Sequence, residues 1–243
     1  MKTPQAVILA AGLGTRLQPL TRKTPKPLIS INGKPLLSYH IASLQEYGIE
    51  HIFVKTFYKN ECFEKFVSQP GYDDISLIVE APKTLGTAGF LWSHSHLFKD
   101  ELIIVYGDNL TNLDYGRFLS HFSHDPCDFG MAVFFVENLA DKGRVEFDGE
   151  GRVQRLTEKP RGDIPNAGFA NAGIYFFRKK LLKELQFDGG ECDFAHDVIP
   201  ALINHGKLVK IYKMKETLID IGTPEGLSQA KKFAKQITSK LVK

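Results

Sequence analysis

The sequence predicts an α/β protein with a mostly parallel sheet and a small inserted β-hairpin. Short apolar, β-rich runs alternate with segments of helical periodicity, which is typical of repeated βαβ units. An alternating strand, turn and strand at residues 144–157 interrupts this pattern and indicates the hairpin. The predicted strands are Ala6–Ala10, His51–Thr56, Ser76–Val79, Leu102–Tyr106, Gly130–Val136 and Gly173–Phe177.

The helices are predicted between these strands and at the end of the chain. Residues 35–47 form the first, which stops at Gly48, and its apolar face comprises Leu36, Leu37, His40, Ile41 and Leu44. Leu85–Phe98, Tyr115–Ser123 and a lysine-rich segment at about 224–241 give the others. Because no repeat or low-complexity linker divides the chain, we predict a single domain over residues 1–243, with the inserted lobe at about 140–170.

Composition limits the class of protein. A content of 43% hydrophobic residues is ordinary for a folded protein. The 31 basic and 28 acidic residues are spread along the chain, so no nucleic-acid partner is expected. Three scattered cysteines indicate neither a disulfide framework nor a zinc site and suit the reducing cytoplasm. The apolar run at residues 6–11 is too short to span a membrane, so no membrane association is expected.

A glycine-rich turn follows the first predicted strand. Gly12 and Gly14 allow backbone N–H groups to approach phosphate oxygens, and the guanidinium of Arg16 can hold two of them. A dinucleotide fingerprint would need a third glycine at Leu17, and the sequence after Gly14 lacks the Gly-Lys-Ser/Thr of a P-loop. The turn therefore predicts a phosphate site of another kind.

Lys26 stands between two prolines, in Thr24-Pro25-Lys26-Pro27-Leu28. The prolines predict an extended segment that directs a single ammonium group to a fixed place, as a phosphate ligand requires. The alternative is a strand-to-helix turn followed by a solvated lysine. Together, Gly-Leu-Gly-Thr-Arg and Pro-Lys-Pro resemble the motif of the sugar-nucleotide pyrophosphorylases, also called the NTP transferase family.

This resemblance covers nearly the whole chain. It implies a Rossmann-like mixed sheet flanked by helices, with a nucleotide over the glycine loop and a sugar phosphate across from it. The segment Glu80–Gly89 resembles the family's base-recognition loop, and its Leu-Gly-Thr-Ala-Gly is closest to guanylyltransferases for mannose or heptose 1-phosphate. The implied nucleotide-binding residues are Leu9, Ala11, Gly12, Gly14, Thr15, Glu80, Leu85 and Gly86.

Two aspartates are candidate metal ligands. Asp108 follows the predicted strand that ends at Tyr106, at the carboxyl edge where open α/β sheets bind ligands, and Asp220 lies between two isoleucines. The resemblance implies that both hold a Mg²⁺ ion bridging the nucleotide α-phosphate and the sugar phosphate, and two carboxylates suffice for Mg²⁺. Alternatively, Asp108 is a helix N-cap and Asp220 a turn residue.

The resemblance also implies a sugar site. Glu158 would bind sugar hydroxyls and Lys159 the sugar phosphate, although a surface ion pair between these two residues is the alternative. Gly107, Asn171 and Gly173 would line the sugar pocket.

The resemblance implies Mg²⁺-assisted transfer of a nucleoside monophosphate from an NTP to a sugar 1-phosphate, with release of pyrophosphate. Arg16, Lys26, Asp108 and Lys159 would be catalytic, and GTP with mannose or heptose 1-phosphate the substrates. A uridylyl-, thymidylyl- or cytidylyltransferase for another sugar phosphate or phosphocholine, an inactive nucleotide-sugar-binding regulatory subunit, and a homo-oligomer all stay open. The chain ends soon after Asp220, so a hexapeptide-repeat β-helix and acetyl transfer are not expected.

Overall fold

The computed structural model describes residues 3–125, 127–158 and 167–241, which form two compact units. Unit 1 comprises Met1–Thr84, Val105–Tyr115 and Glu216–Lys243, and unit 2 comprises Leu85–Ile104 and Gly116–Lys215. Each unit is therefore assembled from segments that lie far apart in the sequence. The predicted single domain over the whole chain stays a prediction.

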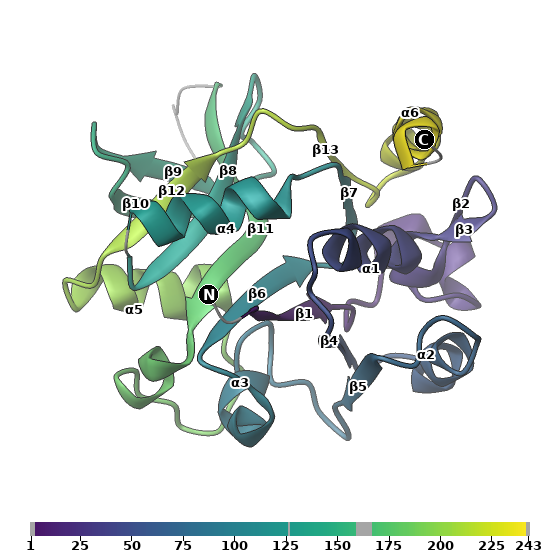
Figure 1. The fold of residues 1–243 in the computed structure, drawn as a ribbon, viewed down its shortest axis with the longest axis horizontal. Coiled ribbons are helices and arrows are strands. Elements are labelled where there is room, and N and C mark those ends of the chain that lie inside the picture. The colour runs from purple at the N-terminus through teal and green to yellow at the C-terminus, as the bar shows by residue number, and fades with distance from the viewer. Residues whose placement is uncertain (1–2, 126, 159–166, 242–243) are drawn as a thin grey trace. The chain divides into compact units, whose positions relative to one another are not determined.

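The sheet of unit 1 is parallel. Strand β1 (Gln5–Leu9) pairs with β4 (Ile52–Thr56), and β4 pairs with β5 (Ile75–Val79), as Figure 1 shows. The end of β6 (Glu101–Tyr106) lies on the other side of β1. β1 and β4 are buried almost throughout, which is why their apolar residues are continuous rather than alternating.

The helices of unit 1 cover its sheet and loops. They are α1 (Leu36–Glu46), α2 (Asn60–Val67) and α6 (Pro224–Leu241), the last of which lies beside the short strands β2 (Ser30–Ile31) and β3 (Lys34–Pro35) in Figure 1. Helix α1 buries the five residues that its periodicity predicts. A group of buried residues that we call the α6 cluster joins α6 to the glycine loop. It contains Leu17, Ile29, Ile31, Leu36, Leu110, Ile221, Leu227, Ala230 and Ala234.

Two short strands of unit 1 form a separate antiparallel ribbon. β7 (Asn109–Thr111) follows β6 after a tight turn, and β13 (Leu218–Asp220) precedes α6. Their register pairs Asn109 with Asp220. The ribbon is fastened at its far end, where the hydroxyl of Thr111 donates to the carbonyl of Thr217 over 2.8 Å. This pairing brings Asp108, the residue before β7, close to Asp220 at the end of β13.

The sheet of unit 2 is mixed. The long strand β11 (Gly168–Arg178) pairs antiparallel with β8 (Phe129–Val136), and β8 pairs in parallel with β12 (Val209–Lys213). The inserted hairpin consists of β9 (Arg144–Phe147) and β10 (Val153–Thr157), and β9 joins β11 at Ala170. The predicted hairpin at residues 144–157 is thus confirmed.

The remaining helices differ in part from the prediction. The structure has α4 (Tyr115–His124) where one was predicted, and also α5 (Ile199–Asn204) after a π-helical turn at Phe194–Val198. The predicted helix at Leu85–Phe98 is wrong, because only α3 (Phe90–Ser93) and a 3₁₀ turn at Ser95–Leu97 are helical there. Gly86 has a φ of +77° and its segment bonds to Cys192 instead of winding into a helix.

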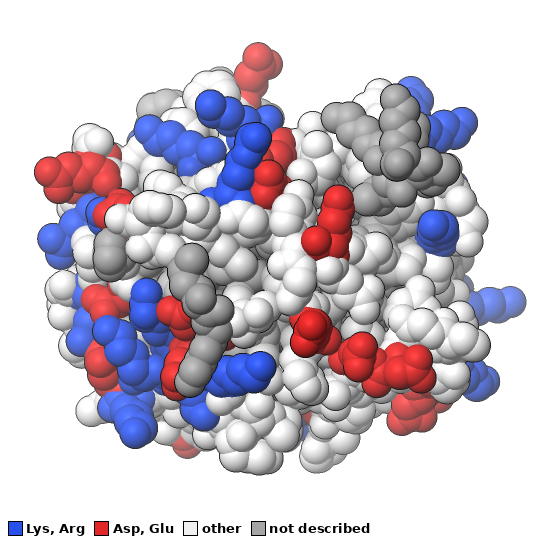
Figure 2. All heavy atoms as spheres, viewed as in Figure 1, with Lys and Arg blue, Asp and Glu red and all other residues white. Residues whose placement is uncertain are grey.

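The predicted fold class is confirmed: a mixed, mostly parallel Rossmann-like sheet flanked by helices, with a small inserted hairpin. Within the described residues, none of the helices is both long and apolar enough to cross a bilayer. On the face shown in Figure 2, basic and acidic side chains are interspersed rather than gathered in one basic band.

Candidate active site

The glycine loop connects β1 to three consecutive 3₁₀ turns, at Thr15–Leu17, Leu20–Arg22 and Lys26–Leu28. Gly14 adopts a left-handed φ of +62°, and a Cβ there would lie 2.8 Å from Cγ2 of Thr21. The hydroxyl of Thr21 donates to the carbonyl of Gly14 over 2.8 Å, which holds the loop in this shape. Gly12 and Thr15 are exposed, so their backbone N–H groups can reach a ligand.

Lys26 is buried beneath this loop. Its segment is not extended as predicted, because Pro25 takes an extended conformation but Lys26 begins a 3₁₀ turn with Pro27 in its first positions. The side chain is only 7% exposed, which excludes the solvated lysine of the alternative interpretation. Its Nζ donates to Oδ2 of Asp108 over 2.9 Å and to Oδ1 of Asp220 over 3.2 Å.

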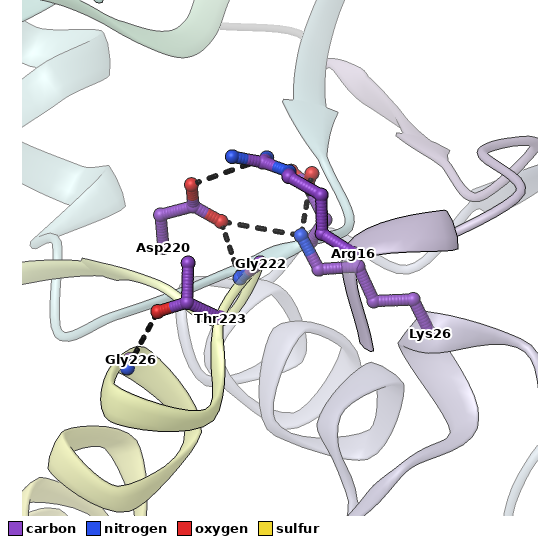
Figure 3. A network of polar contacts seen from close by, with 7 residues as sticks. Arg16, Lys26, Asp220, Gly222, Thr223 and Gly226 are labelled. Carbon is purple, nitrogen blue, oxygen red and sulfur yellow. Dashed lines mark hydrogen bonds and ion pairs between the residues drawn. The ribbon is translucent and has the colours of Figure 1, made fainter. Parts of the chain in front are cut away.

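The β7–β13 ribbon positions both aspartates on this one ammonium group. Asp108 lies in the turn between β6 and β7, so it does not cap a helix. Asp220 is the last residue of β13, and its Oδ1 also accepts a hydrogen bond of 2.7 Å from the N–H of Gly222. Figure 3 shows that Arg16 approaches the other oxygen, with Nη2 at 3.7 Å from Oδ2 of Asp220. Structure therefore brings Arg16, Lys26, Asp108 and Asp220 together.

Three glycines allow the backbone to pack this closely. A Cβ on Gly222 would lie 2.7 Å from Nη2 of Arg16 and 2.9 Å from Oδ1 of Asp220. A Cβ on Gly226, in the first turn of α6, would overlap the carbonyl oxygen of Asp220. Gly107, one of the predicted sugar-binding residues, donates its N–H to the carbonyl of Leu9 over 2.9 Å and is closely packed against β1. At Gly226 and Gly107 the backbone itself thus excludes a side chain, whereas a side chain at Gly222 would displace the ends of Arg16 and Asp220.

The charges in this group stabilise the ionised form of Asp220. Burial alone would raise the pKa of its carboxyl group, but the Lys26 ammonium, the N–H of Gly222 and the Arg16 guanidinium outweigh that effect and lower the pKa below its ordinary value. Asp220 is therefore a carboxylate across the physiological range of pH, as a metal ligand must be.

The two carboxylates fit Mg²⁺. Their side chains are 41% and 35% exposed, and both already direct an oxygen at one cation, the ammonium of Lys26. Among the residues that the structure describes, no set of three or more His, Cys, Asp or Glu could form a metal site. An ion held by Asp108 and Asp220 would complete its shell with substrate oxygens and water, which is the usual arrangement for Mg²⁺.

His40 lies on α1 beneath Asp108. Burial lowers its pKa to about 4, although a hydrogen bond with the backbone of Asn109 and the charge of Asp108 oppose that shift. The pKa of His40 is lower in the folded protein than in the unfolded chain. Between pH 6.5 and about pH 4, the imidazole is therefore protonated in the unfolded chain but neutral in the folded protein. The contribution of His40 to stability is therefore complete above pH 6.5 and is lost as the pH falls through this window.

We expect the free energy of unfolding of a His40→Gln variant to depend less on pH than that of the wild type, by up to about 1.4 kcal/mol per pH unit within that window. Urea unfolding at about pH 7 and about pH 5 measures the difference. The exposed residue His96 supplies the matched control, His96→Gln, which should keep the wild-type dependence. Equal pH dependence in all three proteins would contradict the prediction.

The predicted base-recognition loop begins in unit 1 at a buried ion pair. Lys55 on β4 and Glu80 after β5 are each only 2% exposed, with Nζ of Lys55 2.7 Å from Oε2 of Glu80. The hydroxyl of Thr84 donates to the same Glu80 oxygen over 2.8 Å and accepts from Lys55 over 3.1 Å. The arrangement fixes residues 80–84, and the role of Glu80 in base recognition stays a prediction.

The rest of that loop belongs to unit 2 and is attached to residues 192–194. The N–H of Cys192 donates to the carbonyl of Leu85 over 3.0 Å, and a Cβ on Gly86 would overlap the carbonyl of Cys192. The hydroxyl of Thr87 donates to Asp193 over 2.6 Å and accepts from the N–H of Phe194 over 2.9 Å. The backbone of Leu85 and Gly86 is thereby held in one conformation.

The predicted sugar residues of unit 2 lie on or near β11. Asn171 donates to the hydroxyl of Tyr175 over 2.8 Å and accepts from the N–H of Gly173 over 3.0 Å, at an irregularity where Gly173 has a φ of +66°. A Cβ on Gly143 would overlap the carboxylate of Glu158. Lys159 lies outside the described residues, so the structure addresses neither its predicted contact with the sugar phosphate nor the alternative ion pair with Glu158.

Sequence reasoning missed several residues that shape the site. Thr21 and Lys55 had no motif around them, and Gly222 was passed over although it stands two residues after Asp220. His40 was predicted only as part of an apolar helix face. The usable signal was the Asp-Ile-Gly-Thr-Pro run, in which a glycine and a proline frame the start of α6.

A glycine loop, two cations and two carboxylates at the carboxyl end of a Rossmann-like sheet are typical of a nucleotide-binding protein. The chain belongs to the nucleotidyl transferase family, whose sequence model matches residues 5–237.

Individual relatives are similar over most of this chain. A mannose-1-phosphate guanylyltransferase of Mycobacterium tuberculosis is 30% identical over 90% of this chain and 61% of its own length. A glucose-1-phosphate adenylyltransferase of Bacillus licheniformis is 28% identical over 93% of this chain and 65% of its own length. This chain thus spans less than two thirds of these curated relatives. The crystal structure of HddC from Yersinia pseudotuberculosis complexed with GMP-PN has a TM-score of 0.80 and 28% identity, covering 94% of this chain and 98% of that one.

Proposed function

We propose that this protein is a sugar-1-phosphate nucleotidyltransferase that converts an NTP and a sugar 1-phosphate into a nucleoside-diphosphate sugar and pyrophosphate. The observation that carries the proposal is the convergence of Asp108 and Asp220 on the buried ammonium of Lys26, beside the glycine loop and Arg16. Such a group of fixed charges suits the neutralisation of a polyphosphate, and membership of the family supports the same reaction.

The residues of the loop would bind and orient the nucleotide. The backbone N–H groups of Gly12 to Thr15 and the guanidinium of Arg16 would hold the departing pyrophosphate, and Lys26 would bind the α-phosphate. Leu9, the last residue of β1, and Ala11, two residues after it, would also bind the nucleotide. Lys26 is buried and its backbone is fixed in a 3₁₀ turn, so its ammonium is confined to the site when charge develops.

The chemistry is a direct in-line displacement. An anionic oxygen of the sugar 1-phosphate attacks the α-phosphorus, a new P–O bond forms, and the bond to the β-phosphate breaks with its electrons leaving on pyrophosphate. No general base is needed, because this oxygen is already deprotonated near neutral pH. A Mg²⁺ ion on Asp108 and Asp220 would supply further charge neutralisation between the two phosphates.

Substrate recognition is proposed residue by residue. Glu158, Asn171, Gly173 and Gly107 would line the sugar site and Lys159 would bind its phosphate, whereas Glu80, Leu85 and Gly86 would read the base. GTP with mannose or heptose 1-phosphate is the favoured pair, supported by the guanylyltransferase relative and by the GMP-PN complex of HddC. The adenylyltransferase relative keeps other bases as alternatives. The cytoplasm is the proposed location, in keeping with three free cysteines at positions 62, 127 and 192.

Pyrophosphate release by the purified protein tests this function. Each common NTP is combined with mannose, heptose, glucose and N-acetylglucosamine 1-phosphates and with phosphocholine, in the presence of Mg²⁺. We expect release in one combination, and that combination identifies base and acceptor together. If NTP binds but no combination releases pyrophosphate, the result would favour a nucleotide-sugar-binding regulatory subunit or a substrate outside this panel.

A further inference from the structure

The ammonium of Lys26 occupies the point on which the two candidate metal ligands converge. It lies 2.9 Å from Oδ2 of Asp108 and 3.2 Å from Oδ1 of Asp220, distances at which it satisfies both carboxylates. The side chain of Lys26 is 7% exposed, whereas those of the two aspartates are several times more exposed. The ammonium therefore contacts the carboxylates on the side that faces the protein interior, and solvent reaches them on the opposite side. A lysine ammonium here acts as the counter-ion of the carboxylate pair.

The group as a whole carries no net charge. Asp108 and Asp220 contribute two negative charges, and Lys26 and Arg16 contribute two positive charges, with Arg16 3.7 Å from Asp220. A divalent cation that joined this neutral group would meet two nearby positive charges, and repulsion at a few ångströms in a partly buried site is substantial. The carboxylates alone are therefore a poor site for a divalent cation.

A polyphosphate changes this balance. Its negative charges attract the ammonium of Lys26 and the guanidinium of Arg16 away from the carboxylates and add oxygens that a hard cation prefers. The backbone of Lys26 is fixed in a 3₁₀ turn between Pro25 and the buried Ile29, but its ammonium ends a flexible four-carbon stem. The ammonium can therefore move by a change of side-chain rotamer, without backbone movement.

We propose that Lys26 is the resident counter-ion of Asp108 and Asp220, and that it exchanges for a divalent cation when the phosphates of a nucleotide bind. The protein consequently binds the divalent cation together with the nucleotide, and only weakly by itself. This inference rests on the proposed function for the metal-binding role of the two aspartates. It adds an order of binding and a second task for Lys26, which screens the carboxylates in one state and binds phosphate in the other.

Direct measurement of Mn²⁺ binding to the nucleotide-free protein tests the exchange. The electron paramagnetic resonance signal of free Mn²⁺ is followed as the ion is titrated into wild type, Lys26→Met and the control Lys23→Met, which removes an exposed lysine of the same segment. We expect Lys26→Met to bind Mn²⁺ at least about tenfold more tightly than the other two proteins, because the counter-ion is gone. Adding Asp220→Asn to Lys26→Met should abolish that gain.

Two results would overturn the proposal. One is wild-type protein that binds Mn²⁺ as tightly as Lys26→Met, and the other is a gain that survives the Asp220→Asn change. Circular dichroism establishes that each variant is folded, and Lys26→Gln replaces Lys26→Met if the latter is not. The Mn²⁺ measurement is separate from turnover. A tenfold gain in Mn²⁺ affinity for Lys26→Met, together with no pyrophosphate release by the wild type in any substrate combination, would support the exchange while contradicting the proposed function.

Discussion

Asp108→Asn should reduce the rate of pyrophosphate release by about 10²–10³-fold, the size of effect seen when one preorganised charge-stabilising group is removed. Asparagine keeps the shape of the side chain and can still contact Lys26, but it removes one of the two negative charges on which the proposed Mg²⁺ depends. Asp108 is 41% exposed, so the change should leave the fold almost as stable as before. The loss should therefore be one of turnover.

The experiment compares kcat, KM and the midpoint of urea unfolding for the variant and the wild type. Asp74→Asn, which alters an exposed aspartate of unit 1, is the control and should leave all three values unchanged. Near-normal turnover of Asp108→Asn in a folded protein would eliminate the metal assignment. A similar loss of turnover accompanied by a large drop in the unfolding midpoint would instead indicate a structural role.

Lys55→Met should lower the free energy of unfolding by about 3–5 kcal/mol, the cost of breaking a buried ion pair by removal of one partner. The change would leave the carboxylate of Glu80 buried without its ammonium, at a site where both side chains are only 2% exposed. The neighbouring Thr84 hydroxyl would still donate to Glu80, but a hydroxyl carries no compensating charge. The effect should therefore exceed that of an ordinary surface change.

Urea unfolding of Lys55→Met, of the double variant Lys55→Met/Glu80→Leu and of the control Lys65→Met measures this cost. Replacing both members of a buried pair by apolar residues is often neutral or stabilising, so the double variant should recover most of the loss. Lys65 is exposed on α2, and its replacement should change the unfolding free energy by less than about 0.5 kcal/mol. A double variant less stable than Lys55→Met would show that the pair is stabilising in itself.

The sequence predicts the central strands well because their apolar runs are continuous and buried on both faces. The run at residues 6–10 corresponds to β1, and the five apolar positions of α1 are all buried in the structure. The prediction of a helix at Leu85–Phe98 fails because the backbone of Leu85, Ala88 and Gly89 forms hydrogen bonds with Cys192, a residue that is distant in sequence. Helix α2 was missed, since its charged residues obscure the two buried phenylalanines.

The site divides in the same way. The glycine loop and Lys26 stand in motifs that a single sequence reveals, and a family resemblance supplies Asp108 and Asp220. The contact partners of Lys26 could not be predicted, because they lie 82 and 194 residues away and depend on the pairing of two three-residue strands. Its burial was likewise hidden, since lysine is rarely buried unless it is paired.

The β7–β13 ribbon also determines the order in which contacts form during translation. Asp220 is translated 194 residues after Lys26, an interval of about 10–40 s at ordinary rates of elongation. During that interval the nascent chain can pair β1, β4 and β5, but Lys26 has at most one of its two acidic partners and the α6 cluster lacks its helix. Asp220 and α6 arrive together, so the electrostatic neutralisation of Lys26 and the closure of the hydrophobic core around the loop are completed in one late event.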